Sequence, residues 1–142
     1  VIVDAKPKKP AARSRRKPSA KAAKAEAAAL AESLKSPHQV IALGGGTPMG
    51  PAGRALLADA KLAGPAQVTI AYLRVDARTL KLRLATDPTP RPSLTGRGTI
   101  DEVDEILAVR DPVYHALAHH TLDAAGSPAT VADRVLALAA RP

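Results

Sequence analysis

Short apolar runs alternate along the chain with longer stretches in which apolar residues recur at helical spacing. Three runs are too short for helices and predict strands, of which the first, at residues 40–43, is expected to be a buried strand. The other two lie at residues 68–73 and 121–123. Strands that alternate with helices predict an α/β fold, with a parallel sheet that helices cover on both faces.

The helical stretches carry their own start and stop signals. Pro51 can occupy a first helical position, Asp76 can cap a helix, and Thr99 with Glu102 fits a capping box. Gly64-Pro65 is a stop signal. The predicted helices are 20–35, 52–63, a segment after Asp76 that contains Leu80 to Leu84, 99–110, 112–118, and a closing helix that Ser127-Pro128 opens and that runs to Leu138.

Three consecutive glycines, Gly44, Gly45 and Gly46, follow the first predicted strand directly. Glycine has no side chain and can adopt positive φ, so backbone N–H groups in such a loop can approach a ligand closely. In open α/β sheets ligands bind at the carboxyl ends of strands, which is where this loop would lie. A surface turn explains the triplet equally well, and the glycines alone leave both interpretations open.

A polar loop and a group of histidines are further candidates for function. Residues 87–99 form a loop rich in Pro and Gly, of a length typical of lids and binding loops. His115 and His119 fall on one helix face, and a pair at this spacing can begin a zinc site. Because no carboxylate or thiolate stands at ligand spacing, we expect ordinary surface histidines, His120 included, and no metal site.

Composition narrows the class of protein. The 142 residues allow one domain, and their hydrophobic fraction of 46% includes no Phe or Trp, so Leu, Val, Ile and Ala must form the core. The absence of cysteine excludes disulfides and Cys-ligated metals. No segment is long enough to span a bilayer and no apolar signal region lies near the start, so the expected location is the cytoplasm.

The net charge of +8 is concentrated at the amino-terminal side. Residues 1–25 contain nine Lys and Arg residues against Asp4 alone, so the remaining 117 residues are balanced. An Ala/Pro/Lys/Arg segment with almost no bulky apolar residues is expected to be a disordered basic tail. Such a tail can bind nucleic acid through phosphate neutralisation. A linker or solvated extension is the favoured interpretation, because no aromatic residue interleaves the charges to stack bases.

Four segments together resemble the shikimate kinase family. They are Val40 to Gly46, Tyr72-Leu73-Arg74, Arg91 to Gly96, and Arg110-Asp111-Pro112-Val113-Tyr114. The resemblance covers the chain from about residue 38 to the end, and we assign residues 26–142 to a shikimate-kinase-like domain. It implies a fold like that of P-loop nucleoside-triphosphate kinases, and ATP-dependent phosphorylation of shikimate with Mg²⁺ in aromatic amino acid biosynthesis. A complete protein of this family is expected to be a monomer.

The resemblance also implies roles for particular residues. In that family the triple glycine lines the shikimate pocket, which corresponds to Gly44–Gly46. The arginine that binds the shikimate carboxylate corresponds to Arg110, the lid arginine that contacts ATP phosphates to Arg91, and the loop that packs on adenine to Ser127 and Pro128. A guanidinium suits these tasks because it presents a planar, permanently charged fork. Judged from its position alone, Arg110 can also have a purely structural role, as a cation at the carboxyl end of a helix, where the helix dipole favours positive charge.

The sequence departs from the family pattern in one large respect. No lysine follows a glycine anywhere, so the P-loop with its lysine and its Mg²⁺-binding Ser or Thr is absent. The acidic strand end that grips the substrate hydroxyls and the second carboxylate-binding arginine are also missing. We therefore expect a carboxyl-terminal portion whose sheet lacks its central strand and which is inactive alone. The alternative is a noncatalytic kinase-like remnant with a nucleic-acid-binding tail.

Overall fold

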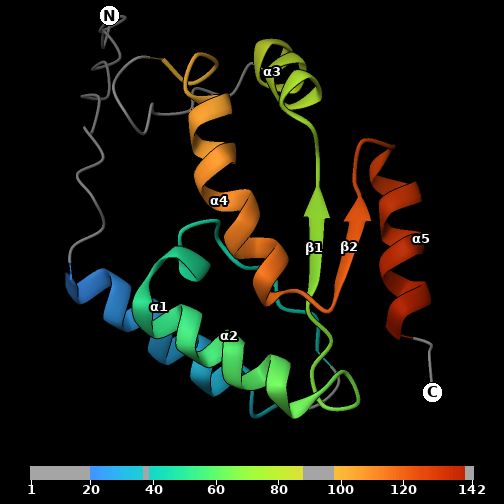
Figure 1. Ribbon diagram of the computed structural model, residues 1–142. Coiled ribbons are helices and arrows are strands. Elements are labelled where there is room, and N and C mark those ends of the chain that lie inside the picture. The colour runs from blue at the N-terminus through green and yellow to red at the C-terminus, as the bar shows by residue number, and fades with distance from the viewer. Residues whose placement is uncertain (1–19, 37–38, 88–97, 140–142) are drawn as a thin grey trace, which may run out of the picture.

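A computed structural model describes residues 20–36, 39–87 and 98–139 (Figure 1). Two of the three predicted strands are present in these ranges, and helices precede and follow each of them. The elements are α1 Ala20–Ser33, the 3₁₀ turn η1 Thr47–Met49, α2 Pro51–Ala63, β1 Ala71–Arg74, α3 Ala77–Thr86, α4 Val103–Leu117, β2 His120–Asp123 and α5 Pro128–Ala139.

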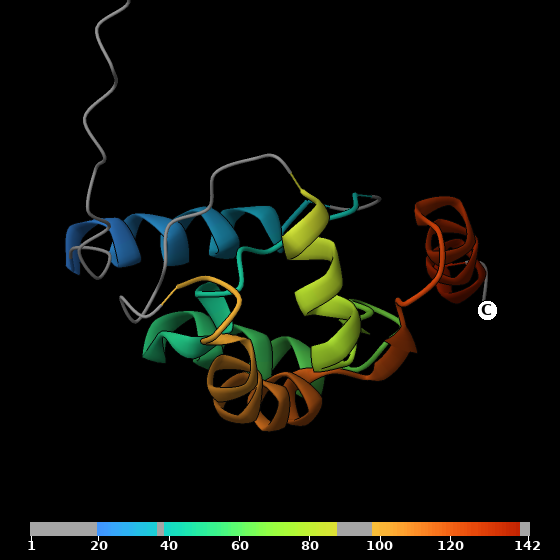
Figure 2. The ribbon, with the colours of Figure 1, turned by 90° about the horizontal axis from the view of Figure 1, so that it is seen from above.

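Strands β1 and β2 form a parallel pair with Ala71 opposite His120 and Arg74 opposite Asp123. Helix α4 lies on the side of β1 and α5 on the side of β2, as Figures 1 and 2 show from two directions. The parallel sheet with flanking helices confirms the predicted α/β class. Strand β1 begins later than predicted, because the N–H of Val68 bonds back to Gly64 instead of joining the ladder.

The prediction of a buried strand at residues 40–43 is wrong. These residues lie outside any strand, and the exposed fractions of Val40, Ile41 and Leu43 are 88%, 37% and 39%. Among the described residues β1 pairs only with β2, so the segment has no strand beside it to complete a ladder. Backbone groups without a partner strand remain hydrated, and an apolar run by itself does not fold into a sheet.

Several helix signals are confirmed. Helix α2 begins at Pro51 and ends before Gly64, which takes a φ of 91° that suits glycine. Asp76 caps α3 by accepting a 2.9 Å hydrogen bond from the N–H of Thr79. Ser127 caps α5 in the same way, accepting from the N–H of Thr130 at 3.2 Å.

Two predictions about the region of α4 are wrong. Residues 99–110 and 112–118 are not separate helices, because α4 runs continuously from Val103 to Leu117 with Pro112 inside it. Proline removes one helical hydrogen bond, to the carbonyl of Ala108, but Ala108 is exposed and water can satisfy that group. The helix also starts four residues beyond Thr99, with buried Glu102 in the position before its first residue.

The core lies where α1, α2 and α4 meet. Leu30, Leu57 and Leu117, one from each helix, are at most 7% exposed and form one cluster. Close approach of α2 to η1 requires Gly53, since a Cβ there would overlap the carbonyl of Thr47. This packing places the glycine loop, which precedes η1, beside α4.

Helix α1 begins at Ala20, so it includes residues 20–25 of the predicted basic tail. Residues 1–19 lie outside the described part of the chain, and the predicted disorder and nucleic-acid binding of the tail stay predictions. None of the described helices has the length and hydropathy needed to cross a membrane.

Candidate functional site

The glycine loop and Arg110 lie in direct contact. A Cβ built on Gly45 would stand 3.0 Å from Nη1 of Arg110, although the two residues are 65 positions apart in the sequence. Arg110 projects from α4 and is half-buried. The structure thus brings together two of the features that the sequence assigns to one pocket.

Arg110 is not a cation placed to balance a helix end. Helix α4 continues to Leu117, two turns beyond Arg110, and the basic residue in its last turn is His115. Within the described ranges no carboxylate forms an ion pair with Arg110. A half-buried guanidinium without a carboxylate partner is a good ligand for an external anion.

The backbone of the loop also offers donors. In the part of the chain that the structure describes, the N–H groups of Gly45 and Gly46 have no hydrogen-bond acceptor. The Gly44 carbonyl, in contrast, accepts from Thr47 at 3.0 Å. Two consecutive backbone N–H groups without an acceptor form an arrangement that favours oxyanions.

Two side chains, from α1 and from α4, hold the glycine loop and the residue that follows it. Glu26 of α1 accepts a hydrogen bond from the Thr47 hydroxyl, and its carboxylate would stand 3.4 Å from a Cβ on Gly44. The Tyr114 hydroxyl of α4 donates to the Gly45 carbonyl at 2.6 Å. Tyr114 belongs to the motif that includes Arg110, but its spacing in the sequence does not reveal this contact.

Asp111 fixes α4 against β1. It accepts hydrogen bonds from Nε of Arg74 at 3.0 Å and from the Tyr72 hydroxyl at 2.8 Å. The bond from Arg74 holds the pKa of Asp111 below its usual range, and the bond from Tyr72 acts in the same direction. Burial raises the pKa of Tyr72 to about 12, and Asp111 adds to this rise. Both groups therefore keep their hydrogen-bonding forms at neutral pH.

The residues assigned to adenine lie at a different place. Ser127 and Pro128 are exposed at the start of α5, just after β2. Arg83 of α3 holds the preceding segment, because its Nη2 donates to the carbonyls of Ala124, Ala125 and Gly126 at 2.9, 2.8 and 3.1 Å. Arg91 lies outside the described residues, so its predicted contact with ATP phosphates stays a prediction.

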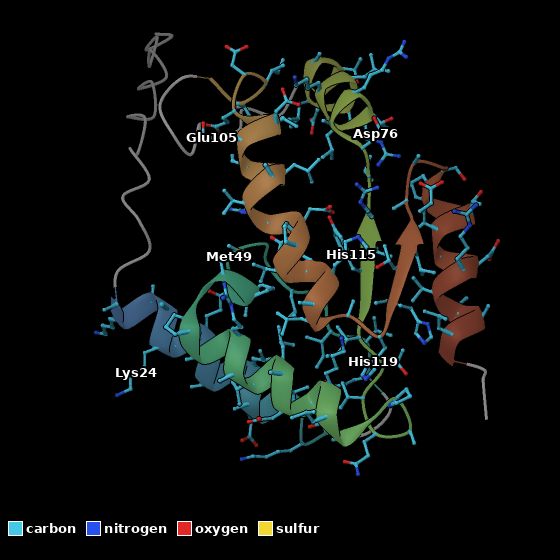
Figure 3. All side chains as sticks on the ribbon, viewed as in Figure 1. Lys24, Met49, Asp76, Glu105, His115 and His119 are labelled. Carbon is cyan, nitrogen blue, oxygen red and sulfur yellow. The ribbon has the colours of Figure 1, made fainter. Side chains whose placement is uncertain are left out.

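The expectation that all the histidines are ordinary surface residues is wrong for His119 (Figure 3). Its Nδ1 accepts from the N–H of Ile70 at 3.0 Å, and its Nε2 lies 3.1 Å from the carbonyl of Lys61. These contacts require a neutral ring with the proton on Nε2, and they tie the end of α2 to the start of β1. His115 contacts the Thr121 hydroxyl and the edge of the Tyr72 ring.

Among the residues described, no group of three His, Cys, Asp or Glu side chains is placed to hold a metal ion. Within this part of the chain the chemistry centres on Arg110 and the glycine loop, which suit an anionic ligand.

The chain is similar to known proteins of one family. The family model described as shikimate kinase matches residues 15–140. The protein named Shikimate kinase 2 of Yersinia pestis (strain Pestoides F) is 36% identical over 107 residues, which cover 74% of this chain and 58% of that protein. Proteins of the same name from Yersinia pseudotuberculosis serotype O:3 (strain YPIII) and Yersinia enterocolitica serotype O:8 match with the same identity and coverage.

The chain thus spans a little over half the length of these curated relatives. The family match, in contrast, covers nearly all of the chain, including both the glycine loop and Arg110. Sequence, fold and comparison agree: the chain belongs to the shikimate kinase family.

Proposed function

We propose that this chain carries the acceptor-binding side of a shikimate kinase, which transfers the γ-phosphoryl group of ATP to a hydroxyl of shikimate in aromatic amino acid biosynthesis. The observation that carries the proposal is the position of Arg110. Its guanidinium has no carboxylate partner among the described residues and lies against the glycine loop. Shikimate has one carboxylate, which this cation would pair with.

Arg110 would bind the carboxylate as a charged hydrogen-bond donor, and the loop would complete the pocket. The Gly45 and Gly46 N–H groups have no acceptor in the described chain, so they are open to an oxygen of the ligand. A side chain at Gly45 would crowd both Arg110 and Tyr114, because its Cβ would stand 3.0 and 3.1 Å from their terminal atoms. Orientation of the acceptor is the main contribution that such a pocket makes to phosphoryl transfer.

On the nucleotide side we propose that Ser127 and Pro128 contact adenine and that Arg91 contacts the phosphates. The clamp that Arg83 forms on residues 124–126 supports the first assignment, because it holds the approach to Ser127 rigidly. ATP supplies the transferred group and Mg²⁺ neutralises its charge when both are bound. Because the sequence contains no P-loop lysine, we propose that the chain alone lacks turnover.

The proposal is tested by titrating shikimate into the chain and following the amide NMR signals. We expect the chemical shifts of the Gly45 and Gly46 amides to change as shikimate is added, until the site is saturated. Arg110→Ala should weaken binding by about 1.5–3 kcal/mol, the range for a charged hydrogen bond. Arg78→Ala is the matched control, since Arg78 is an exposed arginine of α3 that makes no ion pair within the described residues.

Equal affinity in the Arg110→Ala variant and the unmodified chain would end the assignment of Arg110. If Arg78→Ala weakened binding as strongly as Arg110→Ala, the effect would come from the general positive charge of the protein. Movement of signals elsewhere, with Gly45 and Gly46 unchanged, would place the ligand outside the proposed pocket.

A further inference from the structure

We propose that Tyr114 is a positioning residue of the acceptor pocket, whose hydroxyl holds the glycine loop against the Arg110 guanidinium. This inference rests on the proposed function, because that function makes Arg110 and the glycine loop two walls of one pocket. It assigns to Tyr114 a task that neither the motif nor the family comparison gives it.

The geometry places both α4 side chains on the same face of one glycine. Arg110 and Tyr114 are four positions apart on the helix and so project from the same side. A Cβ on Gly45 would stand 3.0 Å from Nη1 of Arg110 and 3.1 Å from the hydroxyl oxygen of Tyr114. The hydrogen bond from the Tyr114 hydroxyl is therefore formed at the same residue that contacts the guanidinium, and it fixes the distance between the glycine loop and Arg110.

The hydrogen bond from Tyr114 also sets the direction of the next peptide group. The hydroxyl donates to the Gly45 carbonyl at 2.6 Å, and in a trans peptide the following N–H points the opposite way. The Gly46 N–H, which has no acceptor in the described structure, therefore points away from the tyrosine hydroxyl and is left open to a ligand. Without this bond three consecutive glycines have many backbone conformations available.

The ring of Tyr114 is held by contacts that do not involve its hydroxyl. It meets the ring of Tyr72 edge to face, with centroids 5.2 Å apart and planes at 72°. Tyr72 in turn is fixed by Asp111. Tyr114→Phe should therefore keep the packing of α4 on β1 and remove only the bond to the glycine loop.

The experiment compares Tyr114→Phe with Thr69→Val in the full chain. Thr69 is the control because its hydroxyl also donates to a backbone carbonyl, that of Pro65 at 3.0 Å, in the turn after α2. We expect similar thermal stabilities in the two variants. In the absence of ligand, only Tyr114→Phe should move the Gly45 and Gly46 amide signals, and it should raise the dissociation constant for shikimate about tenfold, a typical loss for one hydrogen bond. Thr69→Val should leave that constant within about twofold of the original value.

Three results would overturn the inference or separate it from the proposed function. If Tyr114→Phe leaves shikimate binding unchanged while Arg110→Ala weakens it, the role of Tyr114 is overturned and the proposed function stands. If the unmodified chain binds no shikimate, the proposed function fails for this chain, and the ligand-free spectra then decide the role of Tyr114. Gly45 and Gly46 signals that stay unchanged in Tyr114→Phe overturn the inference in either case.

Discussion

Residues 40–43 and strand β1 resemble each other in the sequence and differ in the structure. Both are short and largely apolar, and both belong to segments that resemble the shikimate kinase family. Residues 71–74 pair with β2 along their whole length, whereas Val40 is 88% exposed and its neighbours join no ladder. The difference lies in their surroundings, since β1 has a strand and α4 beside it and residues 40–43 have no described strand to pair with.

An apolar run therefore predicts only that a segment can form a strand. Whether the strand forms depends on a neighbouring strand with which it can pair. Side-chain contacts add to the backbone ladder in β1, where Tyr72 meets Tyr114 and Asp111. The glycine loop after residues 40–43 is held by the bond from Tyr114 to Gly45 and by the bond between Thr47 and Glu26. The candidate site is thus ordered even though the segment that leads into it is not part of the sheet.

The largest loss of stability is expected when a side chain of β1 is truncated. Tyr72→Ala should lower the free energy of unfolding by about 2–3 kcal/mol, because it removes a half-buried ring with two aromatic contacts and a bond to Asp111. Val40→Ala should change it by no more than about 0.5 kcal/mol, as expected for an exposed side chain. Urea denaturation measures both values, and equal effects would erase the distinction between the two segments.

A smaller loss of stability is expected when the contacts before the start of β1 are removed. His119→Ala should cost about 1–3 kcal/mol, because it leaves the Ile70 N–H and the Lys61 carbonyl without their partner. His120→Ala is the control, since the described structure gives the His120 side chain no hydrogen bond. Thermal unfolding of the two variants measures both losses, and a loss in His120→Ala as large as that in His119→Ala would contradict the stabilising role of the His119 hydrogen bonds.

The smallest effect concerns the pH dependence of the anchor at Asp111. Its pKa is lower in the folded protein than in the unfolded chain, so its contribution to stability is present above the unfolded value of about 4 and is lost as the pH falls below that. Asp111→Asn should therefore reduce stability at pH 7 and narrow its difference from the unmodified chain on acidification. A difference that stays constant down to about pH 2 would contradict the ion pair with Arg74.

Much of the fold follows from local signals in the sequence. The caps at Asp76 and Ser127, the start at Pro51 and the stop at Gly64 depend on neighbouring residues, and the structure confirms them. The continuity of α4 through Pro112 could not be predicted, because it depends on the exposure of Ala108 and on packing against β1. The loss of the strand at 40–43 depends on which other strands are present, which no local pattern shows.

In the candidate site, too, some features can be predicted from the sequence and others cannot. Gly44–Gly46 and Arg110 are recognisable because their residue types suit an oxyanion and their motifs match a family. The contact from Tyr114 to Gly45 joins residues 69 positions apart and leaves no periodic signal in the sequence. The clamp that Arg83 forms on three backbone carbonyls is equally hidden, because backbone acceptors are the same at every residue. Position in the fold, more than residue type, determines these roles.

The central claim, that the chain holds the acceptor side of a shikimate kinase without a phosphate cradle, is tested most directly by a coupled ADP-release assay. The purified chain is supplied with ATP, Mg²⁺ and shikimate, and ADP formation is followed with and without shikimate. We expect no shikimate-dependent turnover, because no P-loop lysine is present to stabilise the charge of the transferred phosphoryl group. Turnover that requires shikimate and disappears in Arg91→Ala would contradict the account and require a phosphate site elsewhere in the chain.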